Sequence, residues 1–239
     1  MAIYVTSDAH GHVRALDEAL SKISLASEDT LYVLGDMIDR GPDPVGVIKL
    51  VRSLPNARVL KGNHEQIMLD AIIGQDPLDA ETWDINGGWT TREQLNDMEF
   101  EAYEELVRWM AGLPLYAVAE TDERPYLLVH AGIETEAARA FLLDHDVDCA
   151  DGAGAVGADR ELLKQMLAVQ SSDDLLWIRH GYWDAPTGLL SAEGKGPVVV
   201  SGHTPTVSLG RYCEVGGLAG LDEESGRGQI VRLGGEDTA

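Results

Sequence analysis

The segment TLYVLGDMIDRG, residues 30–41, leads from β-forming apolar residues directly into a glycine, two acids and an arginine. An apolar run of this length that ends at a glycine is typical of a buried strand. The strand would deliver Asp36, Asp39 and Arg40 at its carboxyl end. Carboxylates suit divalent metals, and the guanidinium of an arginine suits a phosphate. This segment alone does not indicate a function. The interpretation depends on whether other segments of the chain also place such side chains at the ends of hydrophobic runs.

Four other segments place acid, amide or imidazole side chains at the ends of hydrophobic runs. They are Ser7-Asp8-Ala9-His10, Gly62-Asn63-His64-Glu65, Val129-His130-Ala131-Gly132 and Gly202-His203-Thr204. The histidines of these segments each follow an apolar β-run, whereas His12, His145 and His180 do not and are interpreted as structural or solvent-facing. Oxygen and nitrogen ligands in this order indicate a pair of divalent transition metals in a phosphoester hydrolase.

Hydrophobic periodicity predicts alternating strands and helices in the first part of the chain. Strands are expected over residues 3–5, 30–34 and 58–60, and helices over 12–24, 44–54 and 65–73. This alternation implies parallel βαβ units, in which ligands bind at the carboxyl ends of the strands. The metal-ligand candidates fall at these ends, so the predicted fold and the predicted chemistry agree.

The rest of the chain departs from this alternation. Residues 74–115 are interpreted as a cap or insertion beside the site, with a helix over 100–111. The other expected elements are a hairpin over 115–119 and 125–130, a surface loop over 144–160, and strands over 198–200, 207–215 and 228–233. No internal repeat is present, and residues 1–239 are interpreted as a single domain.

Composition limits the function classes. The 239 residues are 44% hydrophobic and 25% charged, which is typical of soluble globular proteins. A formal net charge of −23 argues against binding to nucleic acid or to an anionic membrane, because both need basic patches. Bound divalent metals would reconcile this acidity with an anionic substrate. Two cysteines form no disulfide framework and predict a cytoplasmic setting, and no apolar stretch approaches transmembrane length.

The order Asp-x-His, Gly-Asp-x-x-Asp-Arg-Gly, Gly-Asn-His-Glu, His and Gly-His resembles that of the calcineurin-like metallophosphoesterases. Within them it is similar to the phosphoprotein phosphatase branch, which includes bacterial and phage serine/threonine phosphatases and symmetrical diadenosine tetraphosphatases. The motifs run from residue 7 to residue 204, nearly the whole chain. The resemblance implies an α/β fold, a β-sandwich of two mixed sheets flanked by helices, with the active site at the carboxyl-terminal ends of the strands.

The resemblance also implies two divalent metal ions that activate a water for attack on phosphorus. Their ligands would be acids, histidines and one asparagine, namely Asp8, His10 and Asp36 for one ion and Asp36, Asn63, His130 and His203 for the other. Manganese is the metal that the resemblance implies, and iron and zinc suit the same ligands.

Four further residues receive roles from the resemblance. Arg40 would bind phosphate oxygens through its planar fork. Arg179, at the end of the segment LLWIR, would be a second phosphate-binding arginine, or else its stem packs near Trp177. His64 would protonate the leaving alkoxide, and Asp39 would orient the His64 ring.

Three functions remain open at the level of sequence. The first interpretation is a serine/threonine-type phosphoprotein phosphatase, because residues 86–88 and 202–205 are more similar to that type. The second is hydrolysis of dinucleoside polyphosphates such as diadenosine tetraphosphate, or of another nucleotide. The third is an inactive relative that binds a phosphorylated partner. The intact His64 and Asp39 pair argues against the third, since a binding protein needs no leaving-group acid.

Overall fold

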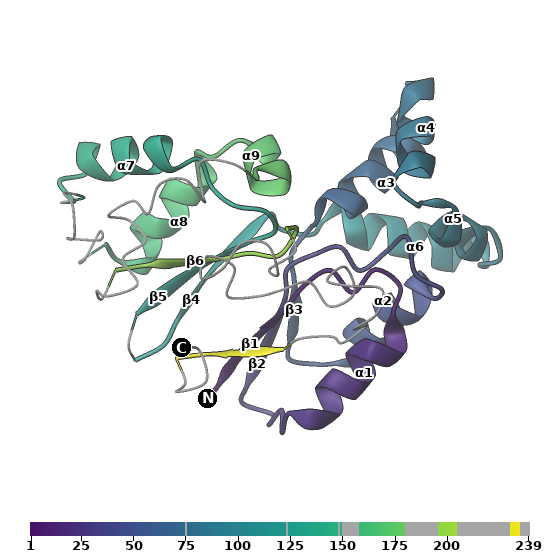
Figure 1. The fold of residues 1–239 in the computed structure, drawn as a ribbon, viewed down its shortest axis with the longest axis horizontal. Coiled ribbons are helices and arrows are strands. Elements are labelled where there is room, and N and C mark those ends of the chain that lie inside the picture. Colours follow the sequence, from purple (N-terminus) through teal and green to yellow (C-terminus); the bar gives the residue numbers. More distant parts are fainter. Residues whose placement is uncertain are drawn as a thin grey trace.

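The computed structural model describes residues 1–74, 76–122, 124–147, 149, 158–179, 196–204 and 230–234. Two mixed β-sheets pack face to face, and helices cover their outer faces (Figure 1). This architecture confirms the predicted α/β class and the sandwich of two mixed sheets flanked by helices.

The first sheet contains the parallel strands that the sequence predicts. It has the order β3-β2-β1-β7, with β1 (Ile3–Thr6), β2 (Thr30–Val33) and β3 (Ala57–Val59) parallel to one another. β7 (Val231–Leu233) is antiparallel to β1. Because the three parallel strands end at the same edge, the loops that follow them lie together at that edge.

The second sheet has the order β4-β5-β6. β4 (Tyr116–Glu120) and β5 (Pro125–Val129) form the predicted hairpin, and β6 (Val198–Val200) runs parallel to β5. β5 and β6 therefore end at one edge, which places His130 and the segment from Ser201 to Thr204 close to each other.

Alternation of side chains along the strands divides the hydrophobic core into three layers. Between the two sheets, Val5 and Tyr32 of the first sheet share a cluster with Leu128 and Val200 of the second. Leu31 points to the opposite side and is 0% exposed among the helices. Full burial of a leucine side chain stabilises a fold by about 1.5–3 kcal/mol.

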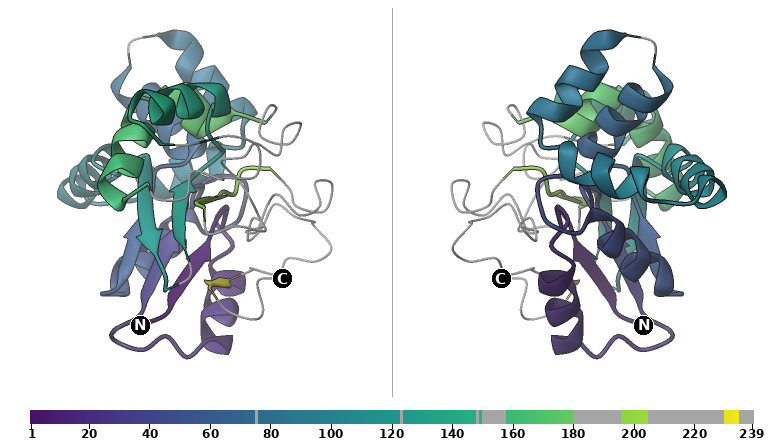
Figure 2. Two further views of the ribbon diagram at one scale, coloured as in Figure 1. Left: turned by 90° about the vertical axis from the view of Figure 1, so that its left-hand side faces the viewer. Right: turned by 90° about the vertical axis from the view of Figure 1, so that its right-hand side faces the viewer.

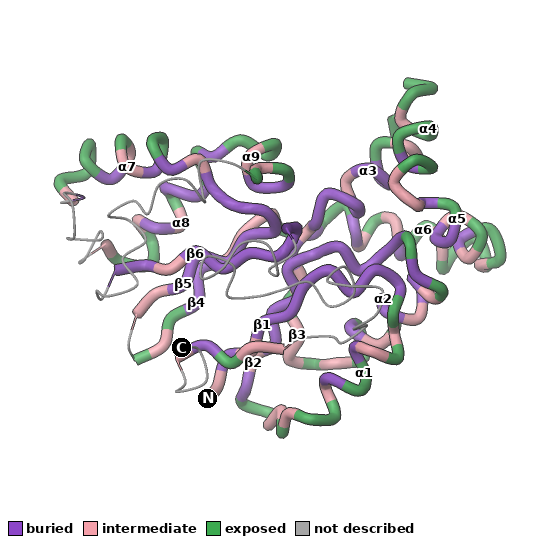
Figure 3. The backbone as a smooth tube through the Cα atoms, viewed as in Figure 1, coloured by how far each residue is buried: buried purple, intermediate pink, exposed green. Residues whose placement is uncertain are grey.

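Two groups of helices cover the outer faces of the sandwich. The first sheet packs against α1 (Val13–Lys22), α2 (Pro44–Ser53), α3 (Asn63–Ile73) and α6 (Phe100–Ala111), and the second against α7 (Thr135–Asp144), α8 (Arg160–Ala168) and α9 (Ser172–Trp177). The strands β1, β2, β5 and β6 and the loops that follow them are largely buried, and many exposed residues lie on the outer helices (Figure 3). None of the helices in the described part of the chain has the length and apolarity needed to cross a membrane.

Residues 77–111 form three helices beside α3, namely α4 (Pro77–Ile85), α5 (Trp89–Asn96) and α6. α4 reaches furthest from the sheets (Figures 1 and 2). This region coincides with the segment 74–115 that the sequence analysis interprets as a cap or insertion. Its role as a separate cap stays a prediction.

Most predicted elements are found within one or two residues of their expected bounds. The helices α4, α5, α7, α8 and α9 were not predicted, and α7 and α8 meet the ends of the expected loop over 144–160. Within that loop, residues 148 and 150–157 lie outside the described residues. The expected strand over 228–233 is represented by β7, and the expected strand over 207–215 lies outside the described residues.

Candidate metal centre

Backbone strain marks the edge where the strands end. In the described part of the chain, the non-glycine residues with positive φ include Asp8 (54°), His10 (40°), Asp36 (52°), Asp39 (69°), Arg40 (64°) and His203 (63°), and the one other is Asp146. Such conformations cost about 1–3 kcal/mol each and cluster at functional sites. Six of the ten residues that the sequence analysis assigns to the site therefore share an unusual backbone conformation.

Backbone hydrogen bonds hold the first two strand-end loops side by side. The N–H groups of Asp8, His10 and Gly11 donate to the carbonyls of Gly35, Asp36 and Met37 at 3.0, 2.9 and 2.9 Å. The left-handed conformations allow this ladder to continue beyond the parallel strands. The acids and the histidine that follow β1 are thereby brought to those that follow β2.

Glu65 holds the third loop to the second. Its side chain is 0% exposed, and Oε2 accepts from the N–H groups of Asp36 and Gly62 at 2.8 and 2.9 Å. Oε1 accepts from the N–H of Met37 at 2.8 Å. Burial raises the pKa of Glu65, and the three N–H donors oppose that shift. No role was predicted for Glu65 from the sequence, although an acid in the first turn of a helix is a signal for such a role.

Glycines permit the close approach of these loops at two positions. A Cβ on Gly62 would lie 2.2 Å from Asp36 Oδ1, and one on Gly35 would lie 2.3 Å from the backbone nitrogen of Gly62. Gly35 also has a φ of +97°, which favours glycine. Any side chain at either position would push the loops that carry Asp36 and Asn63 apart.

The first cluster of ligand atoms consists of His10, Asp36 and His64, all buried. His10 Nε2 lies 3.6 Å from Asp36 Oδ2 and 3.9 Å from Asp8 Oδ1. His10 Nδ1 donates to the carbonyl of Ile38 at 2.9 Å, so Nε2 carries the lone pair. Burial lowers the pKa of His10 to about 3. A neutral imidazole whose lone pair faces two carboxylates is suited to a metal ion.

The second cluster consists of Asp36, His130 and His203. His130 Nδ1 donates to the carbonyl of Leu34 at 2.8 Å, so its Nε2 presents a lone pair to Asn63 Oδ1 at 2.8 Å and to Asp36 Oδ1 at 3.5 Å. His203 Nδ1 lies 3.0 Å from the same Asn63 oxygen. Burial lowers the pKa of His203 to about 2. Converging lone pairs repel one another unless a cation lies among them, so the donor set fits a metal ion.

Asp8 stabilises the second cluster indirectly. Its Oδ2 accepts from the backbone N–H of His203 at 2.9 Å. The residues 8 and 203 are far apart in the sequence, yet this bond fixes the left-handed turn that carries the His203 ring. Asp8 thus faces His10 with one oxygen and anchors His203 with the other.

His64 and Asp39 form the predicted pair. His64 Nδ1 donates to Asp39 Oδ2 at 2.7 Å, and both side chains are buried. Arg40 donates to His64 Nε2 at 2.8 Å and to His10 Nε2 at 3.1 Å. Burial, with Arg40 next in size, lowers the pKa of His64 to about 3. Burial raises the pKa of Asp39 to about 6, against hydrogen bonds from Thr91 and Trp83.

Arg179 lies beside the second cluster. Its Nη1 donates to the carbonyl of His203 and to Thr204 Oγ1, both at 3.2 Å. The Trp177 ring lies edge-on to the His203 ring, with 6.1 Å between centroids. Arg179 therefore supports the turn that carries His203, and a role in phosphate binding stays a prediction.

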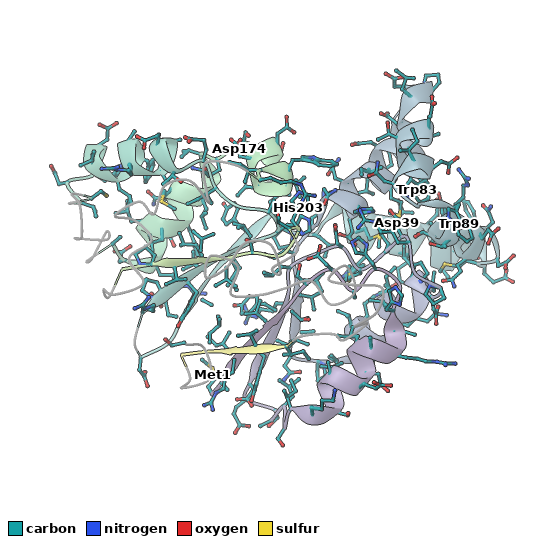
Figure 4. The ribbon with its side chains drawn as sticks, viewed as in Figure 1. Met1, Asp39, Trp83, Trp89, Asp174 and His203 are labelled. Carbon is teal, nitrogen blue, oxygen red and sulfur yellow. The ribbon has the colours of Figure 1, made fainter. Side chains whose placement is uncertain are left out.

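The structure brings all ten predicted site residues to one edge of the sandwich, where nine lie on segments that follow strands of both sheets and Arg179 lies on the segment after α9. Figure 4 shows His203 on one side of this region and Asp39 on the other. His12 and His145 are exposed and lie outside both clusters, and His180 lies outside the described residues. Sequence reasoning missed Trp83 and Thr91, which contact Asp39 from α4 and α5.

Comparison with known proteins agrees with this geometry. A family model described as Calcineurin-like phosphoesterase matches residues 1–226. The chain belongs to this family. Calcineurin-like phosphoesterases use divalent metals. In the described part of this chain, the two clusters around Asp36 could hold such ions.

Two curated relatives carry the name symmetrical bis(5'-nucleosyl)-tetraphosphatase. The one from Proteus mirabilis is 29% identical over 219 residues, which cover 89% of this chain and 68% of that protein. The one from Erwinia tasmaniensis is 32% identical over 136 residues, which cover 56% of this chain and 45% of that protein. The matches to several such relatives thus span about half of their length.

A solved structure supports the fold. The crystal structure of a candidate diadenosine tetraphosphatase has a TM-score of 0.59 and 16% identity, and the match covers 98% of this phosphoesterase and 89% of that chain. At this identity the likeness shows a shared fold over nearly the whole chain.

Proposed function

We propose that this calcineurin-like phosphoesterase hydrolyses phosphoesters with two divalent metal ions, one at each cluster around Asp36. The observation that carries the proposal is the position of the Asp36 carboxylate between the two sets of imidazoles. Its Oδ2 lies 3.6 Å from His10 Nε2, and its Oδ1 lies 3.5 Å from His130 Nε2. The proposed ligands are Asp8, His10 and Asp36 for one ion, and Asp36, Asn63, His130 and His203 for the other.

When bound, the metal ions would supply Lewis-acid charge to phosphoryl oxygens and a water activated for attack at phosphorus. We propose manganese, with iron and zinc suited to the same oxygen and nitrogen ligands. Arg40 would bind a phosphate oxygen, because its guanidinium lies between the two nitrogens of His10 and His64 that face the centre.

His64 is the proposed proton donor to the leaving group. Its Nδ1–H bond to Asp39 leaves Nε2 as the atom that faces Arg40 and any phosphate bound there. The buried carboxylate of Asp39 orients the ring. Burial and, next in size, Arg40 lower the pKa of His64, and a bound phosphate dianion would act in the opposite direction.

We infer that the substrate is a dinucleoside polyphosphate. The match to the Proteus mirabilis tetraphosphatase across 89% of this chain supports this inference. In the symmetrical reaction, water adds to one of the two inner phosphorus atoms and the central bridging P–O bond breaks. Diadenosine tetraphosphate and one water thus give two molecules of ADP. The motifs at 86–88 and 202–205 favoured a phosphoprotein, and we rank that substrate second.

Competing substrates test the proposal. Chelated protein reloaded with manganese is given diadenosine tetraphosphate, phosphoserine, phosphothreonine and phosphotyrosine peptides, and the specificity constants are compared. We expect the dinucleotide to be preferred and ADP to be the sole nucleotide product. A higher specificity constant on a phosphopeptide, or ATP with AMP as products, would overturn the substrate assignment. Chelated protein that receives no manganese is the control.

We further infer that residues 1–239 form one catalytic domain in which 74–115 is an insertion beside the site. The two cysteines favour a cytoplasmic setting, and the side chain of Cys149 is buried. The charge of −23 favours a small anion held by metals over nucleic acid or a membrane.

A further inference from the structure

The carboxylate of Asp39 is fully buried, and two of its partners come from the helices α4 and α5. Trp83 Nε1 donates to Oδ1 at 3.1 Å and to Oδ2 at 3.2 Å. The hydroxyl of Thr91 donates to Oδ1 at 2.6 Å. Trp83 is 3% exposed and Thr91 is 0% exposed. Figure 4 shows Trp83 directed toward Asp39.

Thr91 also binds the backbone of the residue whose side chain it contacts. The N–H of Asp39 donates to Thr91 Oγ1 at 2.9 Å. One hydroxyl thus accepts from the main chain and donates to the side chain, and this pair of bonds fixes Asp39 with its φ of 69°. The following N–H, that of Arg40, donates to the carbonyl of Gly87 at 3.0 Å.

The turn between α4 and α5 is shaped to bring these groups together. Gly87 has a φ of +91°, and a Cβ there would lie 3.0 Å from Arg40 Cγ. A Cβ on Gly88 would lie 2.2 Å from Cδ1 of Trp83. The indole therefore reaches Asp39 across a position that only glycine leaves open.

We infer that Trp83 and Thr91 are positioning residues that hold the Asp39 carboxylate where it orients the His64 ring. In this inference the α4–α5 pair controls how well His64 delivers a proton to the leaving group. The inference rests on the proposed function only in the role of His64 as proton donor. Oδ2 of Asp39 accepts from His64 and from the indole of Trp83, and Oδ1 accepts from the indole and from Thr91. Removal of the indole N–H or of the Thr91 hydroxyl therefore frees the carboxylate to rotate away from His64.

Conservative variants separate positioning from packing. Trp83→Phe keeps an aromatic ring but removes the N–H, and Thr91→Val keeps the shape but removes the hydroxyl. Thr91→Ser restores the hydroxyl. The matched controls are Trp89→Phe and Thr82→Val, which change exposed residues of the same types on α5 and α4.

The experiment measures kcat and KM on nitrophenyl phosphate and on phenyl phosphate, whose leaving group is more basic and needs the proton more. Trp83→Phe and Thr91→Val should each lose about tenfold in kcat on phenyl phosphate, which is the effect expected for loss of one hydrogen bond to a charged group. On nitrophenyl phosphate the loss should stay within about threefold, with KM and metal content unchanged. The serine variant and both controls should match the wild-type protein.

A double variant gives the sharpest comparison. In a His64→Ala background, Thr91→Val should leave the ratio of the two rates unchanged, because the residue that it positions is gone. Equal losses on both substrates, or a further loss in the His64→Ala background, would overturn the inference and assign both residues to packing. If one variant fails to fold, the other still decides the question. Wild-type protein inactive on both aryl phosphates and on diadenosine tetraphosphate would refute the proposed function instead.

Discussion

Glu65 offers the most direct energetic test of how the loops are joined. Its carboxylate accepts three backbone N–H groups, two at Oε2 and one at Oε1. In Glu65→Gln the amide oxygen can replace Oε2, but the amide NH₂ then faces the N–H of Met37 and that bond is lost. A hydrogen bond to a charged group contributes about 1.5–3 kcal/mol, so we expect a destabilisation of that size. Glu65→Ala leaves all three N–H groups without an acceptor and should cost at least twice as much.

Urea unfolding of the chelated proteins measures this difference. The matched control is Glu104→Gln, because Glu104 is an exposed residue of α6 and should change stability by less than about 0.5 kcal/mol. The glutamine variant should also bind manganese more weakly, since Glu65 fixes the backbone of Asp36. A Glu65→Gln protein as stable as the control would show that these bonds do not hold the loops together.

Other expectations follow from the same contacts. Arg40→Ala should keep its metal content and lose about ten- to a hundredfold in specificity constant, as expected for a charge-assisted bond of about 1.5–3 kcal/mol, with weaker vanadate inhibition. If Arg179 binds phosphate, Arg179→Ala should show the same loss of specificity constant and of vanadate inhibition. Unaltered kinetics would indicate that Arg179 only stabilises the turn that carries His203. The N–H groups of Ala2 and then Ala26 lower the pKa of Asp29, so its contribution to stability is present above its unfolded pKa of about 3.9 and is lost as the pH falls. The difference in unfolding free energy between wild type and Asp29→Asn should therefore shrink from pH 6 to about pH 3, and a constant difference would contradict this assignment.

The meeting of the metal-ligand candidates at one edge could be predicted from the sequence, because parallel strands end at a common edge. Asp36 and His10 follow strands whose apolar runs are short and clear, and His130 follows an equally clear hairpin strand. Once the alternation of strands and helices is recognised, the meeting of these side chains follows from topology. The strained left-handed conformations of Asp8 and His203 could not be predicted, since they depend on hydrogen bonds between loops distant in sequence.

The missed features have particular physical causes. Glu134 precedes α7 and caps it by accepting from the backbone N–H groups of Glu136 and Ala137, but glutamate is not a usual helix-capping residue. α8, in contrast, has the usual sequence signals of a helix, because Asp159 caps it and Leu163 and Leu167 recur at helical spacing. The contacts of Trp83 and Thr91 with Asp39 span 44 and 52 residues, and no local pattern reports such pairs.

The central claim is that Asp36 joins two metal sites. Equilibrium dialysis of chelated protein against manganese, followed by elemental analysis, measures it directly. We expect two ions per wild-type chain, and at most one tightly bound ion with nearly complete loss of hydrolysis in Asp36→Asn. Two ions and normal turnover in Asp36→Asn, or full activity of the wild-type protein in the presence of a chelator, would contradict the account.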